Sequence, residues 1–423
     1  METRYKLKTF EFVFVFILFF LSNASAFVYP FWLFPRIVFF QDVLWLLVLV
    51  LLLWLLYKQS LLNDFISVVA EFLALLPFLL FAGLTFFWSV EKAITLGRWL
   101  IFIGVIACGG YVGTKYTLRQ FLRMLSIFGV FILFLNGLIV FVFPRVGIMN
   151  YYTIQDAWKG LYWHKNHMGL IASLINFLCL IEFFDSYHRK GVERIIWFLT
   201  FLMSFAFILK SDSAAALMSS LLMYGLIFVL LLWMKWRKKM TLAHYLFFLL
   251  VVFVAMAGLF SRLDAVLSIF NRNSTLTGRV PMWGFLYEEY FSQRPYFGYG
   301  FNAFWYVETH RVSAQVAAGY PDPIVIADNG FIDLLLNNGW VGFVLFLIFY
   351  FNLWRRAYTF AVKTCGVISI FPLLTMIFIL LANITWSVLF ENESFFMLIM
   401  VCIAILLPRE LDRERDLLFD ANR

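Results

Sequence analysis

Long apolar runs, each close to the length of a membrane-spanning helix and separated by short charged or Pro/Gly-containing breaks, dominate the chain. A helix needs about 20 mostly apolar residues to cross the hydrocarbon core of a bilayer. The pattern therefore predicts an all-α polytopic membrane protein with about twelve spans. Their expected cores are residues 10–29, 37–57, 65–88, 93–112, 121–143, 167–184, 194–209, 214–234, 241–260, 330–353, 366–389 and 394–408.

The placement of basic residues predicts the orientation of these spans. With the N-terminus inside, every short inner connection carries Lys or Arg, as the positive-inside rule requires. Both termini are then cytoplasmic, residues 409–423 form a short cytoplasmic tail, and residues 261–329 form one long outer-face loop between spans nine and ten. One alternative stays open, because basic residues 1–8, apolar residues 10–21 and small residues 22–26 also fit a cleaved signal peptide.

Composition supports a single integral membrane domain over residues 1–423. The chain is 63% hydrophobic and 14% charged, which excludes a cytosolic enzyme, a disordered regulator and a disulfide-stapled secreted module. The net charge of +8 follows from the basic inner connections, so no nucleic-acid partner is needed to explain it. The four cysteines lie in or beside apolar runs without metal-site or disulfide spacing, and we expect them to be buried thiols.

Arg279 is the first candidate for chemistry in the long loop. It follows a Gly, and Pro281 suits the first turn of a helix that would begin there. A guanidinium at a helix entry, where backbone N–H groups are free, favours an anion such as a phosphate or diphosphate. The alternative is an ordinary ion pair with a lipid headgroup or with a loop carboxylate such as Glu288.

Asp328 and Asn329 stand at the outer mouth of the span over residues 330–353. A carboxylate there could cap the helix. It could also act as a general base that takes the proton of an acceptor hydroxyl.

Further polar side chains gather at the ends of other outer helices. Residues 164–167 place Lys165 and Asn166 where they could bind phosphate or sugar oxygens. The spacing of His164 and His167 does not match a helical i, i+4 pair, so we expect no metal site. Lys210 adds a cation in the turn between two spans, and Arg98, inside an apolar run, either faces a polar cavity or snorkels to the interface.

Aromatic residues are abundant in the outer segments, where they could stack on sugars or form an ordinary interfacial belt. They include Trp158, Trp163, Trp283, Tyr299 and Trp305.

An ordered set of motifs resembles the O-antigen ligase and polysaccharide polymerase superfamily, and within it the exopolysaccharide-polymerase-like branch. The motifs are Phe87-Trp-Ser-Val-Glu91, His164-Lys-Asn166 with Gly169, Ser211-Asp-Ser-Ala214, Leu276-Thr-Gly-Arg-Val-Pro-Met-Trp283, Arg294-Pro-Tyr-Phe-Gly-Tyr-Gly-Phe301, Asp328-Asn-Gly-Phe-Ile-Asp333 with Asn338-Gly339, Ala382-Asn-Ile-Thr385 and Glu391-Asn-Glu-Ser394.

The resemblance implies a glycosyltransferase-C-like helical enzyme without metal or cofactor. Such an enzyme transfers glycan from an undecaprenyl diphosphate carrier to a hydroxyl of an acceptor glycan, with inversion, at the outer face of the bacterial inner membrane. By this analogy Arg279 binds the diphosphate and Asp328 is the base. The expected substrate-binding residues are Lys165, Asn166, Lys210, Arg98, Asn329 and Trp283.

The chain departs from the family pattern at two places. The family commonly has His-Asn where this chain has Asp328-Asn329, so the base is either the carboxylate or a histidine elsewhere, His164 or His310. Ligases that attach O-antigen to lipid A core often have Arg after the Ser-x-Ser turn, where this chain has Ala214. This difference favours a polymerase over a ligase.

Other classes of membrane protein make different predictions. A lipid-linked oligosaccharide flippase would also have about twelve spans, with broken, charged helices near the midplane in two related halves. A purely structural assembly component leaves the outer cations unexplained. For a polymerase, the candidate partners besides substrate and bilayer are the chain-length regulator and the flippase of the same pathway.

Overall fold

Almost all of the described chain is helical. The computed structural model describes residues 9–24, 35–58, 73–151, 154–186, 191–236, 279–320, 324–364, 366–389 and 394–421. The long helices are α1 (Thr9–Ala24), α2 (Pro35–Lys58), α5 (Lys92–Lys115), α6 (Leu118–Val142), α8 (Lys165–Asp185), α9 (Gly191–Lys210), α10 (Ala214–Trp236), α15 (Gly330–Thr364), α16 (Phe371–Thr385) and α17 (Phe395–Ala421). The shorter elements include α4 (Leu76–Leu84), α7 (Pro144–Gly147) and a two-stranded antiparallel hairpin of β1 (Ile148–Tyr151) and β2 (Ile154–Trp158).

Seven helices in the described part of the chain are long and apolar enough to cross a bilayer, which confirms an all-α polytopic membrane protein. These helices are Lys92–Lys115, Leu118–Val142, Lys165–Asp185, Gly191–Lys210, Ala214–Trp236, Gly330–Thr364 and Val367–Thr385. Three shorter apolar stretches coincide with the first three predicted spans. The predicted span over residues 241–260 lies outside the described residues, so the total of twelve stays a prediction.

Glycines allow two helices of the bundle to approach closely. Gly109 and Gly113 lie one turn apart on α5, and a Cβ on either would come within 2.7 Å of Val401 or Ile405 on α17. Small residues at this spacing let helix backbones pack tightly in a membrane, where close van der Waals contact drives association. In agreement, every residue of α17 from Phe395 to Leu407 is buried.

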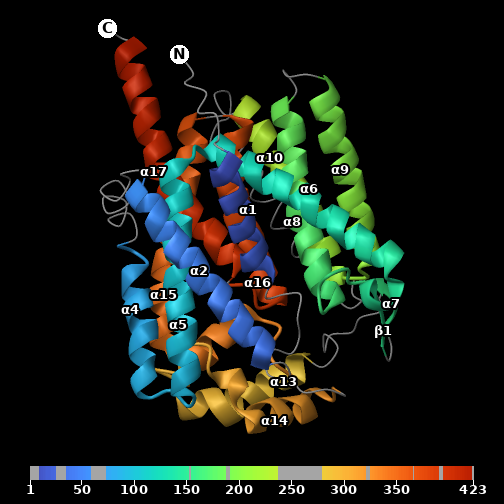
Figure 1. Cartoon of the computed structure of the whole chain (residues 1–423), viewed down its shortest axis with the longest axis vertical. Helices are drawn as coiled ribbons and strands as arrows, with labels where there is room; N and C mark the ends of the chain where they lie inside the picture. Colours follow the sequence, from blue (N-terminus) through green and yellow to red (C-terminus); the bar gives the residue numbers. More distant parts are fainter. Residues whose placement is uncertain are drawn as a thin grey trace.

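The start of α1 and the end of α17 lie at one end of the bundle, and α13 (Arg279–Phe285) and α14 (Glu308–Ala318) lie at the opposite end (Figure 1). We call these the terminal end and the site end. Their placement agrees with an even number of membrane crossings between the termini. Which end faces the cytoplasm stays a prediction from the positive-inside rule.

The described part of the predicted outer loop is a folded element. Its short helices surround a second, smaller hydrophobic cluster, separate from the main core of the bundle. The members of this cluster include Met282, Leu286, Phe291, Phe304, Trp305 and Leu336. The last of these belongs to α15, so the loop is anchored directly on a spanning helix.

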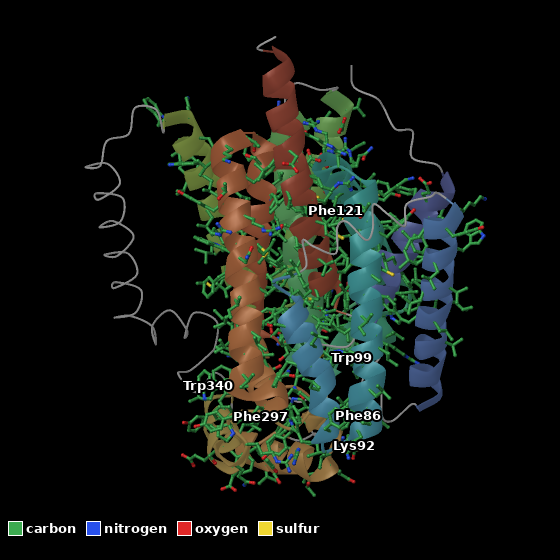
Figure 2. All side chains as sticks on the ribbon, turned by 90° about the vertical axis from the view of Figure 1, so that its left-hand side faces the viewer. Phe86, Lys92, Trp99, Phe121, Phe297 and Trp340 are labelled. Atoms are coloured by element: carbon green, nitrogen blue, oxygen red, sulfur yellow. The ribbon has the colours of Figure 1, made fainter. Side chains whose placement is uncertain are left out.

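A break in α15 provides further hydrogen bonds that hold this folded loop on the helix. Gly339 interrupts the helix with φ of 62°, a conformation that glycine adopts without the Cβ penalty. The carbonyls freed at the break accept hydrogen bonds from Tyr299 and Gly300, and the freed N–H groups of Trp340 and Val341 donate to carbonyls of residues 295 and 296. Figure 2 shows Phe297 and Trp340 near each other at the site end, far from Phe121.

Candidate functional site

An ion pair between Arg279 and Asp328 joins α13, at the site end, to the loop before α15. Arg279 Nε is 3.0 Å from Asp328 Oδ2, and the two side chains are only 17% and 16% exposed. The guanidinium also donates from Nη1 to the carbonyl oxygen of Thr385 at 3.0 Å. One arginine therefore joins the start of α13, the loop before α15 and the end of α16. The loop carboxylate Glu288, the partner considered from sequence, is exposed and is not paired with Arg279.

Asp328 and Asn329 have different roles at the start of α15. Asn329 caps the helix, because its Oδ1 accepts the N–H groups of Phe331 and Ile332 at 3.0 and 3.3 Å. Asp328 has φ of 52°, a left-handed conformation that Asp and Asn adopt more readily than most residues. The carboxylate of Asp328 is consequently free of capping. Burial raises its pKa, and the positive charge of Arg279 lowers it in part.

Trp283 holds the same loop from the side of α13. Its indole Nε1–H donates to the carbonyl oxygen of Ala327 at 2.7 Å. The sequence placed Trp283 among the substrate-binding residues. In the structure its polar atom contacts the backbone next to Asp328, and its ring packs partly buried against the second hydrophobic cluster.

His164 lies beside this ion pair through an aromatic contact. Its ring stacks on Trp386, with centroids 5.5 Å apart, and Trp386 directly follows the Thr385 carbonyl that Arg279 binds. Burial, together with the charges of Lys165 and Arg279, lowers the pKa of His164 to about 3. The ring is therefore neutral near pH 7.

The hydrogen bond at Nδ1 decides which nitrogen of His164 carries the proton. Nδ1 accepts the backbone N–H of Asn166 at 3.1 Å and so caps α8. A neutral imidazole that accepts at Nδ1 carries its proton on Nε2. In this state His164 offers a hydrogen-bond donor, whereas a general base must offer a lone pair. The amide of Asn166 is next to it and partly exposed.

Lys165 is buried, with 2% exposure, and binds Asp212. Its ammonium donates to the Asp212 carbonyl at 2.7 Å and forms an ion pair with the Asp212 carboxylate. The contact fixes the turn between α9 and α10, where Asp212 has a positive φ. Lys210, at the end of α9, is exposed beside this turn. The predicted phosphate-binding roles of both lysines stay predictions.

Arg98 enters a different part of the site end. The side chain is buried, and its guanidinium donates to the Tyr306 hydroxyl at 2.8 Å. The buried guanidinium of Arg98 is thus hydrogen-bonded to a side chain of the folded loop. His310 is also remote from the ion pair in its contacts: its Nδ1 is 2.9 Å from the Phe304 carbonyl, and its ring packs against Tyr290 and Tyr299.

Sequence reasoning did not single out Asp333 and Trp386. Asp333 is buried one turn into α15, and Trp386 is buried in the segment after α16. Asp333 could have been noticed as a carboxylate at the start of an apolar span, where a charge requires partners. Trp386 could not be recognised in this way from the sequence, because its contact with His164 joins residues more than 200 positions apart. Within the described ranges, no group of three or more His, Cys, Asp or Glu side chains gathers as a metal site would require.

The fold and the site define a class: a polytopic α-helical membrane protein with an Arg–Asp ion pair and a neutral histidine at one end of the bundle. Comparison with known proteins is consistent with this class. The sequence model of the family described as O-Antigen ligase matches residues 198–347, a range that contains Arg279 and Asp328. Over 286 residues the chain is also 24% identical to the exopolysaccharide production protein ExoQ of Rhizobium meliloti (strain 1021).

The second match covers 65% of this chain, and the chain spans 63% of the length of that relative. Both findings support an O-antigen ligase- and polymerase-like family for this chain, which confirms the family predicted from the motifs.

Proposed function

We propose that this protein is a polysaccharide polymerase. It transfers glycan from an undecaprenyl diphosphate carrier to a hydroxyl of an acceptor glycan at the outer face of the bacterial inner membrane. The observation that carries the proposal is the ion pair of Arg279 and Asp328, a cation suited to a diphosphate next to a carboxylate suited to a base. It lies at the site end, in a segment that the O-Antigen ligase family model matches.

The proposed reaction is a displacement at the anomeric carbon, without a metal or cofactor. The acceptor hydroxyl attacks that carbon, and Asp328 takes its proton. The bond between the anomeric carbon and the phosphate oxygen breaks, and the diphosphate leaves with the electron pair. Arg279 stabilises the negative charge that develops on the leaving oxygens. His164 donates from Nε2–H to an oxygen of the substrate, as its tautomer allows.

This mechanism requires the ion pair to open when substrate binds. In an inverting displacement the base and the leaving group lie on opposite sides of the reacting carbon; in inverting glycosidases the two working carboxyl groups are about 6.5–9.5 Å apart. The separation of 3.0 Å between Arg279 and Asp328 is shorter than this. We therefore interpret the ion pair as a resting state in which Arg279 turns from Asp328 to the diphosphate as the donor arrives.

Two observations favour a polymerase over a ligase that uses lipid A core as acceptor. The residue after the Ser-x-Ser turn is Ala214, which lacks the arginine common in ligases. The relative that matches over 65% of this chain is named for exopolysaccharide production. Lys165, Asn166, Lys210, Arg98, Asn329 and Trp283 stay the proposed substrate-binding set.

An assay with purified protein and a lipid diphosphate-linked repeat unit, as both donor and acceptor, tests the proposal. We expect a ladder of lengthening lipid-linked products. Transfer to added lipid A core without a ladder would instead make the protein a ligase. No transfer to either acceptor by folded protein would contradict the enzyme proposal and favour a flippase, which a fluorescent lipid-linked oligosaccharide in vesicles would then detect.

The pH dependence of transfer distinguishes the candidate bases. Asp328 accepts a proton only when ionised, so kcat/KM should rise as pH rises through its pKa and level off above it. Burial places that limb above the ordinary carboxyl value of 3.8. His164→Gln should keep the same limb, because His164 is already neutral in that range. In Asp328→His the limb should move toward the imidazole pKa of about 6.5. Loss of the limb in His164→Gln would assign the base to His164.

A further inference from the structure

A buried carboxylate next to the ion pair has no part in the mechanism above. Asp333 is 5% exposed and accepts hydrogen bonds from three separate segments. Its Oδ1 accepts the indole N–H of Trp305 at 2.6 Å, and both oxygens lie within 3.2 Å of the backbone nitrogen of Ala327. The hydroxyl of Ser387 donates to Oδ2.

Two of these partners lie close in sequence to groups of the proposed site. Ala327 directly precedes Asp328. Ser387 follows Thr385 by two residues, and the Thr385 carbonyl accepts from Arg279. Asp333 and Arg279 therefore join the same two segments, the loop before α15 and the segment after α16, from two directions. Trp305 adds the folded loop as a third support.

The contacts of Asp333 are strong enough to set the position of both segments. Hydrogen bonds to an ionised carboxylate are about twice as strong as those between neutral groups. Removing the donors of a buried carboxylate leaves it unsatisfied at a large cost in free energy. Arrangements of the two segments that break these hydrogen bonds are therefore unfavourable. Ala327 is held on both sides of its backbone, because its carbonyl accepts the bond from Trp283 and its N–H donates to Asp333.

We propose that Asp333 is a positioning residue for glycan transfer: through Ala327 and Ser387 it holds Asp328 and the Thr385 carbonyl at the separation that Arg279 spans. Its effect on turnover rests on the proposed function. Its effect on the loop does not, which allows the two to be tested apart.

Ser387→Ala and Trp305→Phe test the proposal, because each removes one donor to Asp333 and leaves the carboxylate in place. Displacements of about 1 Å can cost up to about 100-fold in rate, and we expect each variant to lower kcat about 10-fold. KM for the lipid-linked donor should change less than about 3-fold, because Asp333 itself does not touch substrate. Ser292→Ala is the matched control, since the Ser292 hydroxyl binds a backbone carbonyl on the exposed surface of the same loop.

Amide hydrogen exchange without substrate gives a readout that does not depend on catalysis. In Ser387→Ala, peptides covering residues 324–332 should exchange at least about 10-fold faster, while peptides of α8 and α17 keep their wild-type protection. Faster exchange across the whole bundle, or wild-type exchange in residues 324–332, would overturn the positioning role, as would wild-type kcat in both variants. If wild-type protein transferred glycan to neither acceptor, the proposed function would fail, while the exchange result would still decide whether Asp333 holds the loop.

Discussion

Replacing Arg279 with alanine should abolish glycan transfer, with a loss of about 1000-fold or more. Arginines that neutralise charge on a phosphoryl group in the transition state contribute about 10³–10⁵ in rate. In this protein the guanidinium is also placed by two contacts, the carboxylate of Asp328 and the carbonyl of Thr385. The measurement is the initial rate of transfer from a lipid diphosphate-linked donor by purified protein.

Two further variants make the result for Arg279 interpretable. Arg279→Lys keeps the charge without the planar fork, so it should recover part of the activity. Arg145→Ala, an exposed arginine in α7 outside the site, should transfer at the wild-type rate. Because alanine also removes an ion pair, the yield and melting temperature of Arg279→Ala in detergent must match the wild-type protein. Wild-type transfer by a folded Arg279→Ala protein would exclude the diphosphate role.

Asp328→Asn should slow transfer about 100- to 10,000-fold, the usual contribution of a general base. Asparagine has nearly the same shape and tolerates the positive φ at this position, so the backbone before α15 should be kept. It cannot take the proton of the acceptor hydroxyl. The measurement is kcat at saturating donor, with binding of the donor followed separately.

Asp156→Asn is the matched control for this change, because Asp156 is exposed in β2 and also has a positive φ, of 54°. It should leave transfer unchanged. Asp328→His should restore a measurable part of the rate lost in Asp328→Asn, since imidazole can also accept a proton. Unchanged turnover in Asp328→Asn would show that the base lies elsewhere, with His164 and His310 as the next candidates.

Much of the fold was predictable because a bilayer restricts what a chain can do. Backbone polar groups in hydrocarbon must be paired within the segment, so a long apolar run has few alternatives to a helix. The seven candidate spans accordingly fall on predicted ones. The folding of the segment predicted as an outer loop was harder to foresee, because its short helices have no such length rule. They form around a few aromatic residues and around the break at Gly339.

The candidate site was only partly predictable from sequence. Arg279 and Asp328 could be nominated separately, from a Gly-Arg turn and from a carboxylate at a helix mouth. Their pairing joins positions 49 residues apart in sequence and depends on how α13 contacts the loop before α15. The choice between Asp328 and Asn329 as helix cap depended on one backbone angle, which puts Asp328 in the left-handed region and turns its carboxylate toward Arg279.

The sequence by itself determined the all-helical membrane architecture and indicated the family, since these follow from hydropathy and from local motifs. It also supplied the residues that we propose to bind a diphosphate. The tertiary structure decided which of those residues lie in contact. It paired Lys165 with Asp212 and Arg98 with Tyr306. The hydrogen bond that His164 accepts at Nδ1 indicates that the neutral ring carries its proton on Nε2. The tertiary structure also revealed Asp333, because a buried carboxylate takes its role from donors that come from distant segments, and only packing brings those donors to it.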